Sequence, residues 1–200
     1  MRNLRPPPMN IDKNYIDKQM LKRIDISPFS YHSIEIDGYI PFAIYLNEKS
    51  PDLYWRAGNG STSLIEIGLL KTGELSTIKL ITYDPQMIIQ TIKSPTSSAL
   101  KKTFLPVFDV SSWVVDMNDF SSQFKDAFDT DFQLLIGLDY IELAFSSIKE
   151  NTIESFQGHH FSLDFNDHDE FASLQILNID KNKMTLLRES LRLDKYKSSV

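Results

Sequence analysis

The densest group of side chains that could do chemistry lies in the stretch HHFSLDFNDHDE, from His159 to Glu170. Imidazole and carboxylate groups at this density could hold a divalent metal ion and activate a water molecule, which is the chemistry of a metal-dependent hydrolase. Asp and Asn are also common in turns, because their side chains bond to nearby backbone N–H groups. We therefore interpret Asp167–Glu170 as a turn and keep the hydrolase as an alternative.

Other catalytic patterns are missing from the sequence. There is no G-x-S-x-G motif to present a nucleophilic serine. The stretch AGNGS, Ala57–Ser61, has neither the lysine nor the glycine spacing of a phosphate-binding loop and is interpreted as a plain loop. We accordingly predict a protein that is not an enzyme, with no catalytic residues, no metal site and no cofactor.

Acidic residues are concentrated in one part of the chain. Residues 109–170 contain fourteen acidic and two basic residues, a net charge of −12, whereas the whole chain of 200 residues carries −6. Such a block predicts an acidic face that repels nucleic acid and attracts a basic partner.

The compartment is also indicated by composition. The chain has no cysteine, so it lacks disulfide bonds and thiolate chemistry. The N-terminal stretch MRNLRPPPMNIDKN lacks the apolar core of a secretion signal, and no later apolar run reaches the length of a membrane span. We expect a cytoplasmic protein that binds neither membranes nor nucleic acid.

The elements around these residues are mostly strands. Leu64–Leu70 and Leu75–Tyr83 alternate apolar and polar residues on either side of Lys71-Thr72-Gly73, which predicts a β-hairpin. A similar pattern returns 96 residues later: ELSTIKLIT from Glu74 resembles EFASLQILN from Glu170. An earlier pair, YIPFAI from Tyr39 and YIELAF from Tyr140, requires an offset of 101. These matches indicate an internal repeat, although any two alternating strands share such a pattern.

Three segments favour helices. Ile16, Met20 and Ile24 recur with helical spacing before Pro28. Phe120, Phe124 and Phe128 follow Met117 with the same spacing among aspartates. The third segment, near the C-terminus, has Asp180 at its start and Met184, Leu187 and Leu191 on its apolar face.

Together these patterns predict an α+β protein, predominantly antiparallel sheet, built from two related β-hairpin units with short N-terminal, central and C-terminal helices. The predicted regions form one compact body and are a tail with a short helix (1–30), a first β unit (31–108), an acidic helical connector (109–131) and a second β unit with the C-terminal helix (132–200).

The first hairpin, SLIEIGLLKTGELSTIKLITYD, resembles a hairpin of small bacterial immunity proteins from polymorphic and contact-dependent toxin systems. The resemblance is carried by the Glu-Ile-Gly strand at Leu64–Gly68, the turn at Lys71–Glu74 and the return strand at Ile78–Leu80. It covers about 22 of the 200 residues. It implies an antitoxin that binds a toxin domain in the cytoplasm and occludes its active site.

Many such toxins are basic nucleases, which the acidic block would attract. The predicted partner-binding residues are Asp126, Asp129, Asp131, Asp167, Asp169 and Glu170. A nucleic-acid-mimicking inhibitor and the metal-dependent hydrolase remain as alternative functions.

Overall fold

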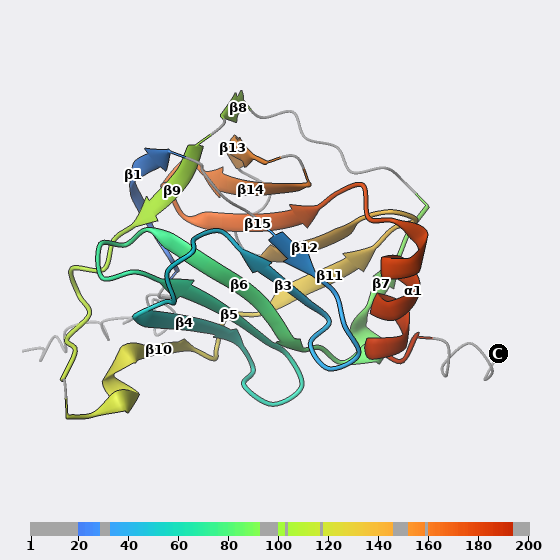
Figure 1. Cartoon of the computed structure of the whole chain (residues 1–200), viewed down its shortest axis with the longest axis horizontal. Helices are drawn as coiled ribbons and strands as arrows, with labels where there is room; N and C mark the ends of the chain where they lie inside the picture. The colour runs from blue at the N-terminus through green and yellow to red at the C-terminus, as the bar shows by residue number, and fades with distance from the viewer. Residues whose placement is uncertain are drawn as a thin grey trace, which may run out of the picture.

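The computed structural model describes residues 20–28, 33–92, 100–102, 104–116, 118–145, 152–158 and 160–193. Strands make up 50% and helices 12% of the structure, so the predicted predominance of antiparallel sheet is correct. The strands form two large sheets and one two-stranded ribbon (Figure 1).

Sheet 1 has six strands. Their spatial order is β10 (Phe124–Ala127), β4 (Leu53–Gly58), β5 (Leu64–Leu69), β6 (Leu75–Thr82), β3 (Phe42–Tyr45) and β2 (Ser33–Glu35). All neighbours are antiparallel except β10, which runs parallel to β4. The predicted hairpin at residues 64–83 is therefore β5–β6.

Sheet 2 has seven strands. Their order is β7 (Ile89–Gln90), β11 (Phe132–Ile136), β12 (Ile141–Phe145), β15 (Phe171–Ile176), β14 (Phe161–Asn166), β13 (Thr152–Gln157) and β8 (Leu100–Lys102). Only the short edge strands β7 and β8 are parallel to their neighbours. The core strands β11 to β15 thus follow the same order as β2 to β6.

The two hairpins also share a register. Ile65 pairs with Leu80 in β5–β6, and Phe161 pairs with Ile176, both 96 residues later, in β14–β15. The pairs that follow keep the same offset, down to Leu69↔Leu75 and Phe165↔Phe171, and both hairpins have a register shift just before this last pair. The β5–β6 hairpin has a second shift, between Leu64 and Ile65. The shared pairing extends beyond what alternation alone requires, because a register can slip by two residues without moving side chains to the other face.

The offset of 101 belongs to a different strand pair from the one inferred from sequence. Trp55↔Ile67 in β4–β5 corresponds to Phe156↔Leu163 in β13–β14, which gives 101 for β4 and β13. For β3 and β12 the pairing partners give 99 instead, since Phe42 pairs with Leu80 and Ile141 with Ile176. The alignment of YIPFAI with YIELAF is therefore wrong by two residues, a slip that preserves the alternation.

A two-stranded ribbon joins the tips of the two hairpins. In this ribbon β1 (Arg23–Pro28) pairs with β9 (Phe104–Phe108). Phe108 N–H donates to the carbonyl of Gly73 at one tip, and Arg23 N–H donates to the carbonyl of Asp169 at the other, both at 2.8 Å. Gly73 and Asp169 both have positive φ, 85° and 61°. An alanine Cβ at Gly73 would lie 2.1 Å from the Phe108 carbonyl oxygen, so glycine is needed there.

The sheets share one hydrophobic core. Trp55 of β4, which is fully buried, meets Phe145 of β12 edge-on with ring centroids 5.8 Å apart. Residues that alternate with these core positions point to the opposite face of each sheet, called the outer face below.

Of the three predicted helices, the C-terminal one is confirmed. It is α1 (Lys181–Ser190), and the Asp180 carboxylate caps it by accepting from Asn182 and Lys183 N–H. Asp84, 96 residues earlier, caps the short 3-10 helix η1 (Pro85–Met87) in the same way. Among the described residues, no helix combines the length and apolar character that a membrane-spanning segment requires.

The other two helix predictions were wrong where the structure describes them. Ile24 lies in strand β1; Ile16 and residues 1–19 lie outside the described residues. Residues 109–131 contain only the 3-10 helix η2 (Phe120–Gln123) before strand β10, and Met117 is not described. The central helix was predicted from the spacing of three phenylalanines. This prediction was wrong because Phe124 pairs with Tyr54 of β4, a tertiary contact that helical periodicity cannot reveal.

Candidate protein-binding surface

Asp126 lies on β10 and is paired with a cation. Its two carboxylate oxygens accept from Arg56 Nε and Nη2 at 2.7 and 2.9 Å. The same guanidinium lies 4.3 Å from the centre of the Phe124 ring and 5.6 Å from that of Phe128. Asp126 therefore orders Arg56 and the aromatic rings around it more than it adds free negative charge.

Asp129 and Asp131 follow β10 and are exposed. Between them, Thr130 is fully buried, and its carbonyl accepts from Gly58 N–H at 3.1 Å. This contact ties the turn to β4, so the two carboxylates are presented from a fixed backbone. Asp131 lines a cleft of about 520 Å³ together with Asp84.

Asp169 and Glu170 lie in the turn between β14 and β15, as predicted for a turn. Asp169 is bound by the Arg23 guanidinium, which also binds Glu154 and stacks 5.1 Å from the ring centre of Phe156. Burial alone would lower the pKa of Arg23, but the hydrogen bonds and negative charges of Asp169 and Glu154 outweigh it and raise the pKa. These carboxylates are thus compensated within the fold.

Asn166 organises the rest of this turn. Its Oδ1 accepts from the backbone N–H groups of His168 and Glu170, both at 2.9 Å, and its Nδ2 donates to Glu170 Oε2 at 2.8 Å. The Asp167 carboxylate lies 3.8 Å from Nε2 of the exposed His168 imidazole. Of the three predicted residues in this turn, Asp167 is exposed, whereas Asp169 and Glu170 are partly buried.

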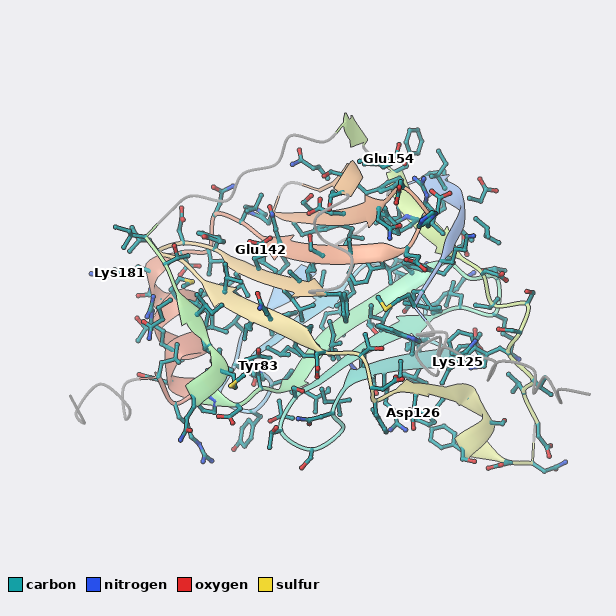
Figure 2. All side chains as sticks on the ribbon, turned by 180° about the vertical axis from the view of Figure 1, so that it is seen from behind. Tyr83, Lys125, Asp126, Glu142, Glu154 and Lys181 are labelled. Carbon is teal, nitrogen blue, oxygen red and sulfur yellow. The ribbon has the colours of Figure 1, made fainter. Side chains whose placement is uncertain are left out.

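The six predicted residues do not form one surface. Asp126 lies at one edge of the molecule, and Glu154, which shares Arg23 with Asp169, lies at the opposite edge, with the strands of both sheets between them (Figure 2). The structure brings together Asp126, Asp129 and Asp131 and separates them from Asp167, Asp169 and Glu170.

The residues around β10 form an aromatic group that the sequence analysis missed. Tyr54 stacks on Phe124 with centroids 5.0 Å apart and planes at 18°, and Phe120 meets Phe124 edge-on at 5.3 Å. Phe120 is 66% exposed and Phe128 41% exposed. We define the β10 surface as Tyr54, Arg56, Phe120, Phe124, Asp126, Phe128, Asp129 and Asp131. Phe124, Asp126 and Phe128 lie two residues apart, a spacing typical of a strand that could have indicated β10.

The possible metal ligands of residues 159–170 do not converge. His159 lies outside the described residues, and His160 lines a separate cleft of about 540 Å³ with Asp180 and Lys183. Within the described ranges, no group of three or more His, Cys, Asp or Glu side chains could hold a metal ion.

Asp164 is instead a buried structural carboxylate. Its Oδ1 accepts from the hydroxyls of Ser155 and Ser162 at 2.5 and 3.1 Å, and its Oδ2 accepts from Ser173 at 2.6 Å. Three hydroxyl donors compensate for the loss of water around a carboxylate that is 5% exposed. This network satisfies itself and presents no nucleophile to a substrate.

The AGNGS loop is also self-contained, as expected for a plain loop. Asn59 Oδ1 accepts from the backbone N–H groups of Ser61, Thr62 and Ser63 at 2.8 to 3.0 Å. The N–H groups that could have held a phosphate are thus already bonded to the loop's own side chain.

Comparison with known protein families finds no match to this chain, and comparison with curated proteins finds none either.

Proposed function

We propose that this protein is an immunity protein that neutralises a cognate toxin domain by binding it directly in the cytoplasm, with the β10 surface as its main contact. The observation that carries the proposal is the pair of exposed rings, Phe120 and Phe128, with the partly exposed Arg56, beside the exposed carboxylates of Asp129 and Asp131. Aromatic and arginine side chains dominate the energy of protein interfaces, and most others contribute little.

Charge supports a basic partner. Residues 109–131, which contain η2 and β10, carry six aspartates and one lysine. Arg56 is engaged by Asp126, and the Lys125 ammonium donates to Ser112 Oγ at 2.8 Å and lies 5.3 Å from the Trp113 ring centre. The remaining negative charge would steer a basic toxin domain, such as a nuclease, toward exposed aromatic anchors.

Co-expression tests the function. The chain would be expressed with the toxin domain encoded beside its gene, and growth of the cells would be followed. Rescue of growth is expected, together with a complex that survives purification at low salt. Loss of viability despite a folded, abundant immunity chain would contradict the proposal.

Matched variants test the surface. We expect the double charge reversal Asp129→Lys/Asp131→Lys to slow association with the toxin at least tenfold at low salt, because it removes long-range attraction. The control is Asp139→Lys/Glu189→Lys, which changes net charge equally at exposed positions outside the β10 surface. Equal slowing by both pairs would show that only net charge matters and would exclude the β10 surface as the contact.

The anchor residues have their own test. Phe128→Ala should weaken the complex by tenfold or more, whereas Leu138→Ala, which removes a side chain that is 71% exposed on another loop, should leave affinity unchanged. Surface plasmon resonance separates the effects, because loss of an anchor raises the dissociation rate and loss of steering lowers the association rate.

We also infer that the two β units descend from one duplicated unit. Support comes from the shared strand order, the hairpin register and the paired caps at Asp84 and Asp180. An experimental structure in which the pairs Ile65↔Leu80 and Phe161↔Ile176 did not both form would contradict this inference.

A further inference from the structure

The edge of sheet 1 at β10 is open among the described residues. β10 is the last strand in the order of its sheet and pairs with β4 on one side only. An unpaired strand edge presents a row of N–H and C=O groups that can bond to another chain. Proteins commonly guard such an edge with a lysine, but the Lys125 ammonium is held by Ser112 and lies over Trp113.

The side chains around this edge define what could pair with it. Phe120 precedes β10 and Phe128 follows it, and both rings are substantially exposed. Within the part of the chain that the structure describes, Asp116, Asp119, Asp129 and Asp131 lie near the strand and carry no ion pair. The pKa of Asp119 is held below its usual range by hydrogen bonds from the Ser121 hydroxyl and N–H, so it is negatively charged at neutral pH.

We propose that the open edge of β10 is a strand-addition site that accepts an extended, lysine- or arginine-rich segment of a partner protein, with Phe120 and Phe128 packing against its apolar side chains. Backbone hydrogen bonds would supply affinity, and the flanking rings and carboxylates would supply selectivity. The proposal deepens the proposed function, on which it rests for the identity of the partner.

The test uses a defined probe, an eight-residue peptide of alternating lysine and valine with blocked ends, and the full-length chain. Amide hydrogen exchange, measured by NMR, should slow at least tenfold at those amides of residues 124–127 that face away from β4 when the peptide binds, and affinity should fall as salt is raised. The matched peptide with glutamate in place of lysine should bind at least tenfold more weakly.

Two proline variants locate the contact. Neighbouring N–H groups of a strand point to opposite sides. Of Lys125→Pro and Asp126→Pro, one therefore removes an N–H group that faces β4, and the other removes an N–H group that faces the open edge. We expect one variant to unfold at lower denaturant, since it loses bonds to β4, and the other to keep its stability but lose the peptide. Asp126→Asn, which removes the ion pair but keeps the backbone N–H, should still bind the peptide.

Three results would overturn strand addition: no peptide binding at millimolar concentration, binding without protection at 124–127, or amides at 124–127 already protected at the open edge in the free protein. If the chain rescues cells from the toxin but does not bind the peptide at β10, the proposed function stands and the strand-addition site is excluded. If the peptide binds and protects the β10 amides but the chain does not neutralise the toxin, the strand-addition site stands and the proposed function is excluded.

Discussion

The outer faces of the two sheets carry different surfaces on matching strands. On sheet 1 the outer positions of β4, β5 and β6 include Tyr54, Arg56, Glu66 and Lys79, all of them partly exposed. The residues in the same register positions of sheet 2 are Ser155, Gln157, Ser162 and Gln175. Ser155, Ser162 and Gln175 are buried.

The comparison shows which positions hold the fold. Facing the core, Ile67 and Ile78 of sheet 1 correspond to Leu163 and Leu174 of sheet 2, all buried aliphatic residues. Because side chains alternate across a strand, the inward set can fix the register while the outward set changes freely. The outer face of sheet 1 accordingly carries partly exposed aromatic and charged residues, whereas the outer face of sheet 2 carries buried polar residues.

One pair of positions makes the contrast sharp. Asp164 in sheet 2 corresponds to Gly68 in sheet 1, and Ser173 corresponds to Thr77. Ser173 donates to Asp164, whereas the buried Thr77 hydroxyl has no hydrogen-bond partner among the described residues. A Cβ on Gly68 would lie 2.4 Å from Thr77 Oγ1 and 2.7 Å from Pro51 Cβ, so sheet 1 has no room for the carboxylate.

The largest expected effect comes from removing the buried carboxylate. Asp164→Ala should lower the free energy of unfolding by about 3 kcal/mol, because three buried serine hydroxyls lose their acceptor. Asp164→Asn keeps one oxygen acceptor and should cost about half as much. Urea denaturation measures both; a loss below about 0.5 kcal/mol for the alanine variant would show that the network adds no stability.

The corresponding change in sheet 1 should have a smaller effect. Gly68→Ala should cost about 2 kcal/mol, since the new methyl group overlaps Thr77 and Pro51. Gly38→Ala is the control, because a Cβ there has no atom within 4 Å. If the two variants denature at the same urea concentration, close packing at Gly68 is not what distinguishes the sheets.

The outer-face cation of sheet 1 should matter less for stability. Arg56→Ala loses a partly exposed ion pair with Asp126 and its stacking on Phe124, for which we expect about 1 kcal/mol. Gln157→Ala, at the matching position of sheet 2, should cost less than about 0.5 kcal/mol. The Arg56 effect should shrink in 1 M salt; a salt-independent loss would assign it to packing alone.

The smallest effect is expected at the hairpin tips. Asp169→Gly relieves a positive φ but loses the ion pair with Arg23, and these opposing terms should leave stability within about 0.5 kcal/mol of the parent. Thermal denaturation at low and high salt measures the balance. A loss above about 1.5 kcal/mol would mean that Arg23 depends on Asp169 more than a partly exposed pair allows.

Local patterns predicted the elements that local physics decides. The alternation of β5 and β6, the turn glycine at Gly73 and the Asp180 cap of α1 were all readable from the sequence. Each depends on neighbours within a few residues, either through side-chain periodicity or through a cap. The turn at Asp167–Glu170 was predicted for the same reason.

The candidate surface could be predicted only in part. Asp126, Asp129 and Asp131 were identified by charge, and the structure places them together beside β10. Phe120, Phe124 and Phe128 were assigned to a helix, so their role around Arg56 was missed. Charge counting also could not show that Arg23, far away in sequence, forms ion pairs with both Asp169 and Glu154.

The amino-acid sequence alone determined the alternating core positions, the repeated hairpin pattern, the acidic block and the C-terminal helix, because periodicity, composition and capping act over short distances. Tertiary structure decided that β10 is a strand, that β1 and β9 join the hairpin tips and that the acidic residues divide between two edges. These features depend on pairing between residues far apart in the sequence, such as Arg23 and Asp169, which are 146 positions apart, and no local preference encodes such pairings.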